Sequence, residues 1–260
     1  MDEMAQLKPK LTRLKLSGVL ESLQHRLGEA TSESWDYTHF LLMLLSDEVE
    51  RRDSKQLSRR VGKSGLDPQK TLATFDFTFN RKIHQPTIKQ LTTCGFLRER
   101  QNLFLVGPSG VGKSHLAQAV GNEACLRGFD VLYRNTHTLF RWLAGGRADG
   151  THERRMQQLR GVDVLILDDF GLRELGESAQ ADLYELISDR YELRPTILTS
   201  NRDFEEWPQV FDNPLMASAA MDRLVHRAVK VVLEGDSYRM NAFKESTRQL
   251  TDTSKKSIST

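Results

Sequence analysis

The sequence has few cysteines, no long apolar run and almost no net charge. Cys94 and Cys125 share no metal-ligand spacing and give no disulfide framework, which fits a compartment where thiols stay reduced. No stretch approaches the roughly 18 consecutive apolar residues of a membrane-spanning helix. The first ten residues carry charges and a proline instead of an apolar signal core. These absences predict a soluble, cytoplasmic protein that has no membrane partner.

The formal net charge is only +2 over 260 residues, so any nucleic-acid surface must come from local clusters of basic residues. This length allows one full α/β domain and a smaller unit. We expect a helical N-terminal domain over residues 1–68, a second domain over 69–250, and a disordered tail rich in Ser, Thr and Lys over 251–260.

The first domain shows the apolar spacing of helices. Between residues 7 and 27 leucines and Val19 recur at steps of three and four, which predicts an amphipathic helix or a helical pair bent at Gly18. A second helix is expected over about 34–61. Gly62, Gly65 and Pro68 then break the pattern, and residues 71–80, with alternating phenylalanines, are expected to be extended.

From residue 102 onward apolar strand patterns alternate with helical ones. Alternation of this kind predicts an α/β fold with a parallel sheet covered by helices. The run over 162–167 is continuously apolar, as in strands buried on both faces. The strands are expected at 102–106, 131–134, 162–167, 196–200 and 229–233, and the helices at 113–127, 138–143, 152–159, 178–191 and 215–229.

A glycine-rich segment lies between the first of these strands and the helix after it. Gly107-Pro-Ser-Gly-Val-Gly-Lys-Ser114 matches the phosphate-binding pattern G-x-x-x-x-G-K-[ST]. Its glycines let backbone N–H groups face a β-phosphate at the start of a helix. Lys113 is expected to reach the β- and γ-phosphates, and the Ser114 hydroxyl to bind Mg²⁺. The segment predicts binding of ATP and Mg²⁺ by Gly107, Ser109, Gly110, Val111, Gly112, Lys113, Ser114 and His115.

Two consecutive carboxylates end the buried strand over 162–167. Asp168 and Asp169 are expected at the carboxyl edge of the sheet, where open α/β sheets bind ligands. Asp168 is predicted to act on Mg²⁺ without direct contact, as a hydrogen-bond partner of its ligands or through a bound water. Asp169, pointing to the other side of the strand, is predicted to orient and deprotonate the attacking water.

Asn201 follows the strand that we expect between the two strands just described. Its amide is a candidate ligand for the γ-phosphate or the lytic water. Asn201 precedes Arg202 and Asp203, so a simple helix cap is the alternative.

These motifs in this order resemble the IstB family, insertion-sequence helper ATPases related to the DnaC-type helicase loaders within the AAA+ class. The resemblance runs from the helical N-terminal region to about residue 245. The segments that carry it are Gly107–Ser114, Leu165–Gly171, Ser188–Tyr191, Thr199–Asn201, Met221–Leu224 and Gly235–Arg239.

The resemblance implies a AAA+ core with strand order 5-1-4-3-2 after a small all-α domain. It also implies a homo-oligomer that assembles on duplex DNA with ATP and recruits and stimulates a partner transposase, with hydrolysis resetting the assembly. By resemblance Asn201 takes the sensor position and Arg223 the arginine finger acting on a neighbouring subunit's nucleotide. A surface salt bridge with Asp222 is the alternative for Arg223.

Three questions stay open at this level. Many AAA+ proteins carry Glu where this chain has Asp169, which leaves room for a DNA-coating scaffold that barely hydrolyses ATP. A DnaC-like replicative helicase loader would share every catalytic motif. Arg190 and Arg239 are candidates for phosphate contact, for a subunit interface or for structural ion pairs.

A basic run in the second predicted helix is the candidate DNA contact. Such a run can bind phosphates without reading sequence, although a charge run is usually a solvated helix face. Further basic residues at 81, 82, 89, 98 and 100 extend the candidate surface. The run consists of Arg51, Arg52, Lys55, Arg59, Arg60 and Lys63.

Overall fold

The computed structural model describes residues 3–80 and 83–241, and the predicted tail over 251–260 lies outside this part of the chain. The chain divides into two compact units, Met1–Arg60 and Val61–Thr260. No helix in the described ranges is long and apolar enough to cross a bilayer. The predicted domain division at residue 68 stays a prediction.

The first unit is built from helices that bury a small leucine-rich core. Leu11, Val19, Leu23 and Leu44 form this core, so helices far apart in sequence pack on one another. The helices are α1 (Glu3–Arg13), α2 (Ser17–Glu33) and α3 (Tyr37–Ser64), the last of which continues into the second unit.

Of the two alternatives, the helical pair is confirmed, but its predicted bend at Gly18 is wrong. The chain turns instead at Lys15, whose φ is 58°. Gly18 lies in the first turn of α2, where its N–H donates to Glu48 Oε2 at 2.5 Å. A Cβ on Gly18 would lie 2.8 Å from Glu48 Cα, so this glycine permits close helix packing and does not mark a bend.

The second unit contains a five-stranded parallel sheet in the order β2-β3-β4-β1-β5. Read from the other edge this is 5-1-4-3-2, so the predicted topology is confirmed. The strands are β1 (Leu103–Val106), β2 (Val131–Asn135), β3 (Val164–Phe170), β4 (Thr196–Ser200) and β5 (Val229–Val232).

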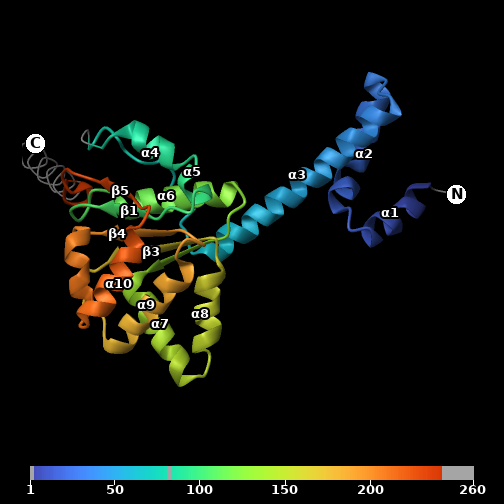
Figure 1. Cartoon of the computed structure of the whole chain (residues 1–260). Coiled ribbons are helices and arrows are strands. Elements are labelled where there is room, and N and C mark those ends of the chain that lie inside the picture. Colours follow the sequence, from blue (N-terminus) through green and yellow to red (C-terminus); the bar gives the residue numbers. More distant parts are fainter. Residues whose placement is uncertain (1–2, 81–82, 242–260) are drawn as a thin grey trace, which may run out of the picture. The chain divides into compact units, whose positions relative to one another are not determined.

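Helices cover both faces of the sheet (Figure 1). One face carries α6, and Gly121 of α6 lets the helix approach Ile166 of β3 closely. The other face packs on the remaining long helices. The helices of this unit are α4 (Gln85–Leu91), α5 (Gly95–Arg98), α6 (Lys113–Leu126), α7 (Thr136–Ala148), α8 (His152–Gly161), α9 (Glu177–Arg190) and α10 (Pro214–Val225), with a 3₁₀ helix η1 (Phe204–Val210).

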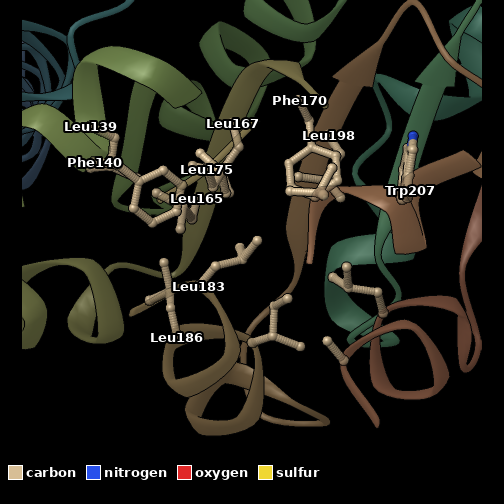
Figure 2. Close-up of a cluster of buried hydrophobic side chains, with 14 of the residues drawn as sticks. Leu139, Phe140, Leu165, Leu167, Phe170, Leu175, Leu183, Leu186, Leu198 and Trp207 are labelled. Carbon is tan, nitrogen blue, oxygen red and sulfur yellow. The ribbon is translucent and has the colours of Figure 1, made fainter. Parts of the chain in front are cut away.

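The main core lies between the sheet and α7 to α10, and Figure 2 shows the part of it around β3, α7 and α9. Leu165 and Leu167 of β3 enter it together with Leu183 and Leu186 of α9. Trp207 of η1 is fully buried and meets the rings of Phe104 and Phe170 edge-on at 5.0 and 4.9 Å between centroids. This core fixes the strand ends that carry the candidate site.

The second unit differs from the sequence analysis in two further respects. Residues 71–80 form turns, so the expected extended segment is wrong. The phenylalanines there do not alternate across a sheet, because Phe75 packs edge-on against both Phe77 and His115. The helices α4, α5 and η1 have seven residues or fewer and were not predicted.

Candidate functional site

The predicted phosphate loop lies between β1 and α6. Its glycines adopt positive φ angles, 86° at Gly110 and 102° at Gly112. A Cβ on Gly110 would lie 2.8 Å from the Cβ of Ser237, so only glycine fits there. The tight loop turns the chain directly into α6, whose first N–H groups have no intrahelical partner and suit an anion.

Lys113 is buried at the start of α6. Its Nζ donates to Gly107 O and Pro108 O, each at 2.7 Å, so the loop's own carbonyl groups hold the ammonium group. Burial lowers the pKa of Lys113, while the negative charges of Asp169 and Asp168 act in the opposite direction. The two aspartates therefore help to keep this lysine protonated beside the loop.

A β-bulge places the two aspartates at the end of β3. Leu167 pairs with Leu198 and Phe170 with Ser200, so Thr199 alone faces two residues of β3. Asp169 takes up the extra residue with a φ of 56°. The bulge interrupts the regular alternation of side chains on which we based the opposite orientations of Asp168 and Asp169.

Asp168 is 4% exposed and is held by hydroxyl groups from both neighbouring strands. Tyr133 of β2 donates its O–H to Asp168 Oδ2 at 2.5 Å, and Thr199 of β4 donates its hydroxyl to Oδ1. Burial, followed by the bond to Asp168, raises the pKa of Tyr133, so the phenol stays a donor. These contacts fix the orientation of the Asp168 carboxylate.

Asp169 is less buried and faces the cavity described below. Its Oδ2 accepts a hydrogen bond from Asn135 Nδ2 at 3.0 Å, and its N–H donates to Thr199 Oγ1 at 3.0 Å. Burial and the neighbouring charge of Asp168 raise the pKa of Asp169, against the positive charges of Lys113 and Arg239. The raised pKa makes Asp169 a better proton acceptor than an ordinary aspartate.

A cavity of about 340 Å³ brings most of the predicted site residues together. Gly107 and Asp168 are not among the residues that line it. Each contacts or adjoins a residue that does, because Gly107 O accepts a hydrogen bond from Lys113 and Asp168 directly precedes Asp169. The predicted residues that line it are Ser109, Gly110, Val111, Gly112, Lys113, Ser114, His115, Asp169 and Asn201.

Aromatic residues on the same cavity were missed by the sequence analysis. Phe75, Phe79 and Tyr238 line it, and the rings of Phe79 and Tyr238 meet edge-on at 5.1 Å. Phe75 also contacts His115, whose Nε2 lies 2.9 Å from Thr71 O. The closely spaced phenylalanines of residues 75–79 could have indicated an aromatic pocket. We interpreted them as extended chain, because the turns that bring them to the cavity have no sequence pattern of their own.

Arg239 also reaches this cavity. Its Nη2 donates to Ser109 Oγ at 3.3 Å, and the N–H of Tyr238 donates to Gly110 O at 3.1 Å. The segment after β5 therefore folds back over the phosphate loop. Arg239 therefore lies beside the predicted phosphate loop.

Asn201 lies exposed on the turn after β4 and lines the cavity. The alternative that Asn201 caps the next helix is wrong. Asp203 performs that role, accepting a hydrogen bond from the N–H of Phe204 at 2.6 Å and forming a capping box with Glu206. The Asn201 amide thus has no capping task.

Arg223 and Arg190 both lie away from this cavity. Arg223 is half-buried on α10, donates to Ala219 O at 2.8 Å and lies 5.6 Å from the ring centre of Tyr184. Arg190 is 2% exposed and is surrounded by backbone carbonyl groups. It donates to the carbonyl groups of Leu159, Val162 and Pro195 at 2.8, 2.9 and 2.7 Å.

Arg190 therefore has a structural role. Burial lowers its pKa, but the carbonyl groups that it contacts favour the charged form. It ties the end of α8 to the residue before β4. The suggested phosphate contact for Arg190 does not match this position.

The basic run on α3 is partly engaged within the first unit. Arg51 Nε pairs with Glu21 Oε2 at 3.2 Å, and Arg52 Nε pairs with Glu48 Oε1 at 2.6 Å. Arg52 also donates to Lys15 O at 3.0 Å. Lys55, Arg59 and Lys63 follow one another at steps of four and so share one helix face. Their contact with DNA stays a prediction.

A protein-family model described as IstB-like ATP binding protein matches residues 9–246. This chain belongs to the IstB-like family. An ATP-binding protein in an insertion sequence of Mycobacterium tuberculosis is 39% identical to this IstB-like protein over 234 residues, covering 90% of this chain and 93% of the relative. The ATP-binding protein of insertion sequence IS21 from Pseudomonas aeruginosa is 34% identical over 237 residues, covering 91% and 89%.

Solved structures share the fold of this IstB-like chain. AMPPCP-bound DnaA from Aquifex aeolicus has a TM-score of 0.56 and 26% identity, covering 72% of this chain and 57% of DnaA. DnaI has the same TM-score with 22% identity and covers 69% of this chain and 98% of DnaI. The DnaC helicase loader has the same fold, with a TM-score of 0.50 and 22% identity, covering 57% of this chain and 87% of DnaC. The predicted AAA+ fold is confirmed.

Proposed function

We propose that this IstB-like protein is an ATPase that assembles on duplex DNA and recruits and stimulates a partner transposase at target DNA, with ATP hydrolysis resetting the assembly. The observation that carries the enzymatic part is one cavity that joins Lys113, Ser114, Asp169 and Asn201 at the carboxyl edge of the sheet. Relatives named as ATP-binding proteins of insertion sequences support the biological part.

The triphosphate binds at the loop between β1 and α6. Backbone N–H groups of the loop and the start of α6 face the phosphates, and the Lys113 ammonium group offsets their charge. The donor set fits Mg²⁺, because the Ser114 hydroxyl lines the cavity and the fixed carboxylate of Asp168 is close enough to act on Lys113. Bound Mg²⁺ would neutralise charge on the β- and γ-phosphates.

Hydrolysis uses groups on the far side of the γ-phosphate. Asp169 accepts the proton of the attacking water, helped by its raised pKa. The Asn201 amide orients that water or a γ-phosphate oxygen. The hydrogen bond from Asn135 keeps the shorter aspartate side chain in one orientation.

The adenine base occupies the aromatic side of the cavity. Phe75, Phe79 and Tyr238 offer ring surfaces, while Arg239 lies over the loop beside the phosphates. Stacking on such rings contributes about 1–3 kcal/mol per base. The segment after β5 then responds to the presence of nucleotide.

Arg223 completes the site of a neighbouring subunit. In this chain it contacts a carbonyl group and an aromatic ring, so no ion pair with Asp222 is needed to explain it. A guanidinium group supplied in trans would stabilise charge on the γ-phosphoryl group and make hydrolysis depend on assembly. The α3 face with Lys55, Arg59 and Lys63 is the proposed duplex contact in the N-terminal region.

Two substitutions test the ATPase. Lys113→Ala should abolish nucleotide binding, measured by calorimetry with Mg²⁺ and ATP, and should also abolish assembly on DNA, observed by electron microscopy. Asp169→Asn should bind nucleotide and assemble normally while phosphate release falls by about 10²-fold or more, within the usual range for a general base.

Each result has a clear opposite. Unchanged phosphate release by Asp169→Asn would refute its role as the base. If the unsubstituted chain and Asp169→Asn both assemble on DNA, and the unsubstituted chain shows no measurable ATP hydrolysis, the DNA-coating scaffold is favoured. Arg154→Gln, a change at an exposed residue of α8 outside the cavity, serves as the control and should behave like the unsubstituted chain.

A replicative helicase loader is the second candidate, because DnaI is matched over 98% of its length. Loader and transposition helper differ in partner. Capture of a purified transposase from a related insertion sequence, with ATP and duplex DNA, supports the first. Capture of a replicative helicase on single-stranded DNA instead would establish the second.

A further inference from the structure

A second cavity, of about 440 Å³, opens at the amino edge of the sheet. Its lining comes from the segments that precede three strands. Arg100 lies just before β1, Asp163 directly before β3 and Arg194 just before β4. The four residues of β1 separate it from the phosphate loop by about 13 Å, at roughly 3.3 Å per residue. It is therefore distinct from the ATP site.

The charge of this cavity is strongly positive. Arg98, Arg100 and Arg194 line it, and all three are exposed, against the single carboxylate of Asp163. That carboxylate already accepts a hydrogen bond from the N–H of Asp130 at 2.8 Å. Within residues 3–80 and 83–241, no ion pair joins any of the three guanidinium groups to a carboxylate.

The three arginines keep most of their hydrogen-bond donors available. Arg100 donates to Glu192 O at 3.3 Å and Arg194 to Arg160 O at 3.1 Å, which uses one contact of each guanidinium group. A guanidinium group carries five N–H donors. The remaining donors can bind an anion without disturbing these contacts.

A purely structural role explains less. The helices α8 and α9 end at this edge, and a cation near a helix C-terminus gains about 0.3–1 kcal/mol. Such an interaction fits Arg194, which contacts a carbonyl group at the end of α8. The same interaction fits Arg100, which contacts the carbonyl group of Glu192 just after α9. It does not explain why three guanidinium groups line one cavity, where like charges repel unless an anion is present.

We propose that Arg98, Arg100 and Arg194 bind backbone phosphates of duplex DNA. Arginine pairs with phosphate through two parallel N–H bonds, and such contacts hold the duplex without reading its sequence. The apolar lining residues are Leu97, Phe129, Leu193 and Pro195. The glycine-rich loop that binds a nucleotide's phosphates lies at the opposite edge of the sheet, so we assign this arginine-lined cavity to a phosphodiester backbone. The inference rests on the proposed function.

The test compares a double variant with a matched control. Arg100→Gln with Arg194→Gln removes two charges but keeps amide donors for the two carbonyl groups. Arg141→Gln with Arg154→Gln changes net charge equally at exposed positions of α7 and α8 outside this cavity. Affinity for a labelled duplex of about 40 base pairs is measured with a non-hydrolysable ATP analogue over a series of salt concentrations.

The cavity variant should bind the duplex at least tenfold more weakly. The slope of log affinity against log salt should fall by about 1–2, at roughly 0.9 for each phosphate that is no longer neutralised. The control should keep both values. Nucleotide affinity and thermal unfolding of all variants should match the unsubstituted chain, which separates DNA contact from misfolding, and Arg98→Glu provides an independent substitution at the same cavity.

Three outcomes are decisive. Equal DNA affinity and slope in the cavity variants and the unsubstituted chain would overturn the inference while leaving the proposed function intact. An equal decrease in the control pair would show a general charge effect and would also overturn it. Failure of the unsubstituted chain to bind duplex DNA, although it binds ATP, would refute the DNA part of the proposed function and this site with it.

Discussion

Replacing Trp207 by alanine should destabilise the second unit severely. Trp207 is fully buried, and its ring lies between Phe104 and Phe170. Truncation of a buried tryptophan typically costs about 3–5 kcal/mol. The ring N–H also donates to Ser200 Oγ at 3.1 Å, and this bond adds about 1 kcal/mol. The total of about 4–6 kcal/mol is comparable to the whole stability of many domains.

Urea unfolding followed by circular dichroism measures this decrease in stability. Trp207→Phe keeps an aromatic ring but removes the N–H donor, so it should cost only about 1–2 kcal/mol, which separates packing from hydrogen bonding. Trp142→Ala, at a half-buried tryptophan on α7, is the control and should cost less than Trp207→Ala. A cost below about 1 kcal/mol for Trp207→Ala would refute the packing argument.

Two further predictions concern the thiols and the base pocket. Burial raises the pKa of the Cys94 thiol to about 11. Alkylation of Cys94 by iodoacetamide at about pH 8 should therefore be slow in the folded protein, increase only as the pH approaches 11, and become fast in urea. Rapid alkylation of Cys94 in the folded protein at about pH 8 would contradict this. Tyr238→Ala should weaken ATP binding by about 5- to 150-fold, the equivalent of about 1–3 kcal/mol of stacking, whereas Tyr238→Phe should not. Titration with a fluorescent ATP analogue checks this, and equal affinity of all three proteins would exclude stacking on Tyr238.

The sequence was most informative where a local pattern determines the structure. The glycine pattern from Gly107 to Lys113 specifies a loop between a strand and a helix, and the apolar run of β3 specifies a buried strand. The order of the strands was predicted only through the resemblance to the IstB family. The bulge at Asp169 was not predictable, because it depends on which residues of β4 pair with β3. A period-two pattern carries no signal for one inserted residue.

The same limit applies to side chains whose partners lie far away in sequence. Arg190 looked like a possible phosphate contact, yet the carbonyl groups that surround it come from the segments before β3 and β4. The rings of Phe79 and Tyr238 are in contact, although more than half of the second unit's sequence separates the two residues. The bend assigned to Gly18 failed because a glycine can serve close packing as well as flexibility.

The hydroxyl of Thr199 touches both aspartates, as a donor to the Asp168 carboxylate and as an acceptor from the N–H of Asp169. Thr199 also lies two residues before Asn201, which directly follows the same strand. A small shift of β4 would therefore displace the Asn201 amide, the Asp168 carboxylate and the backbone of Asp169 together, so the proposed catalytic groups would gain or lose their alignment as one set.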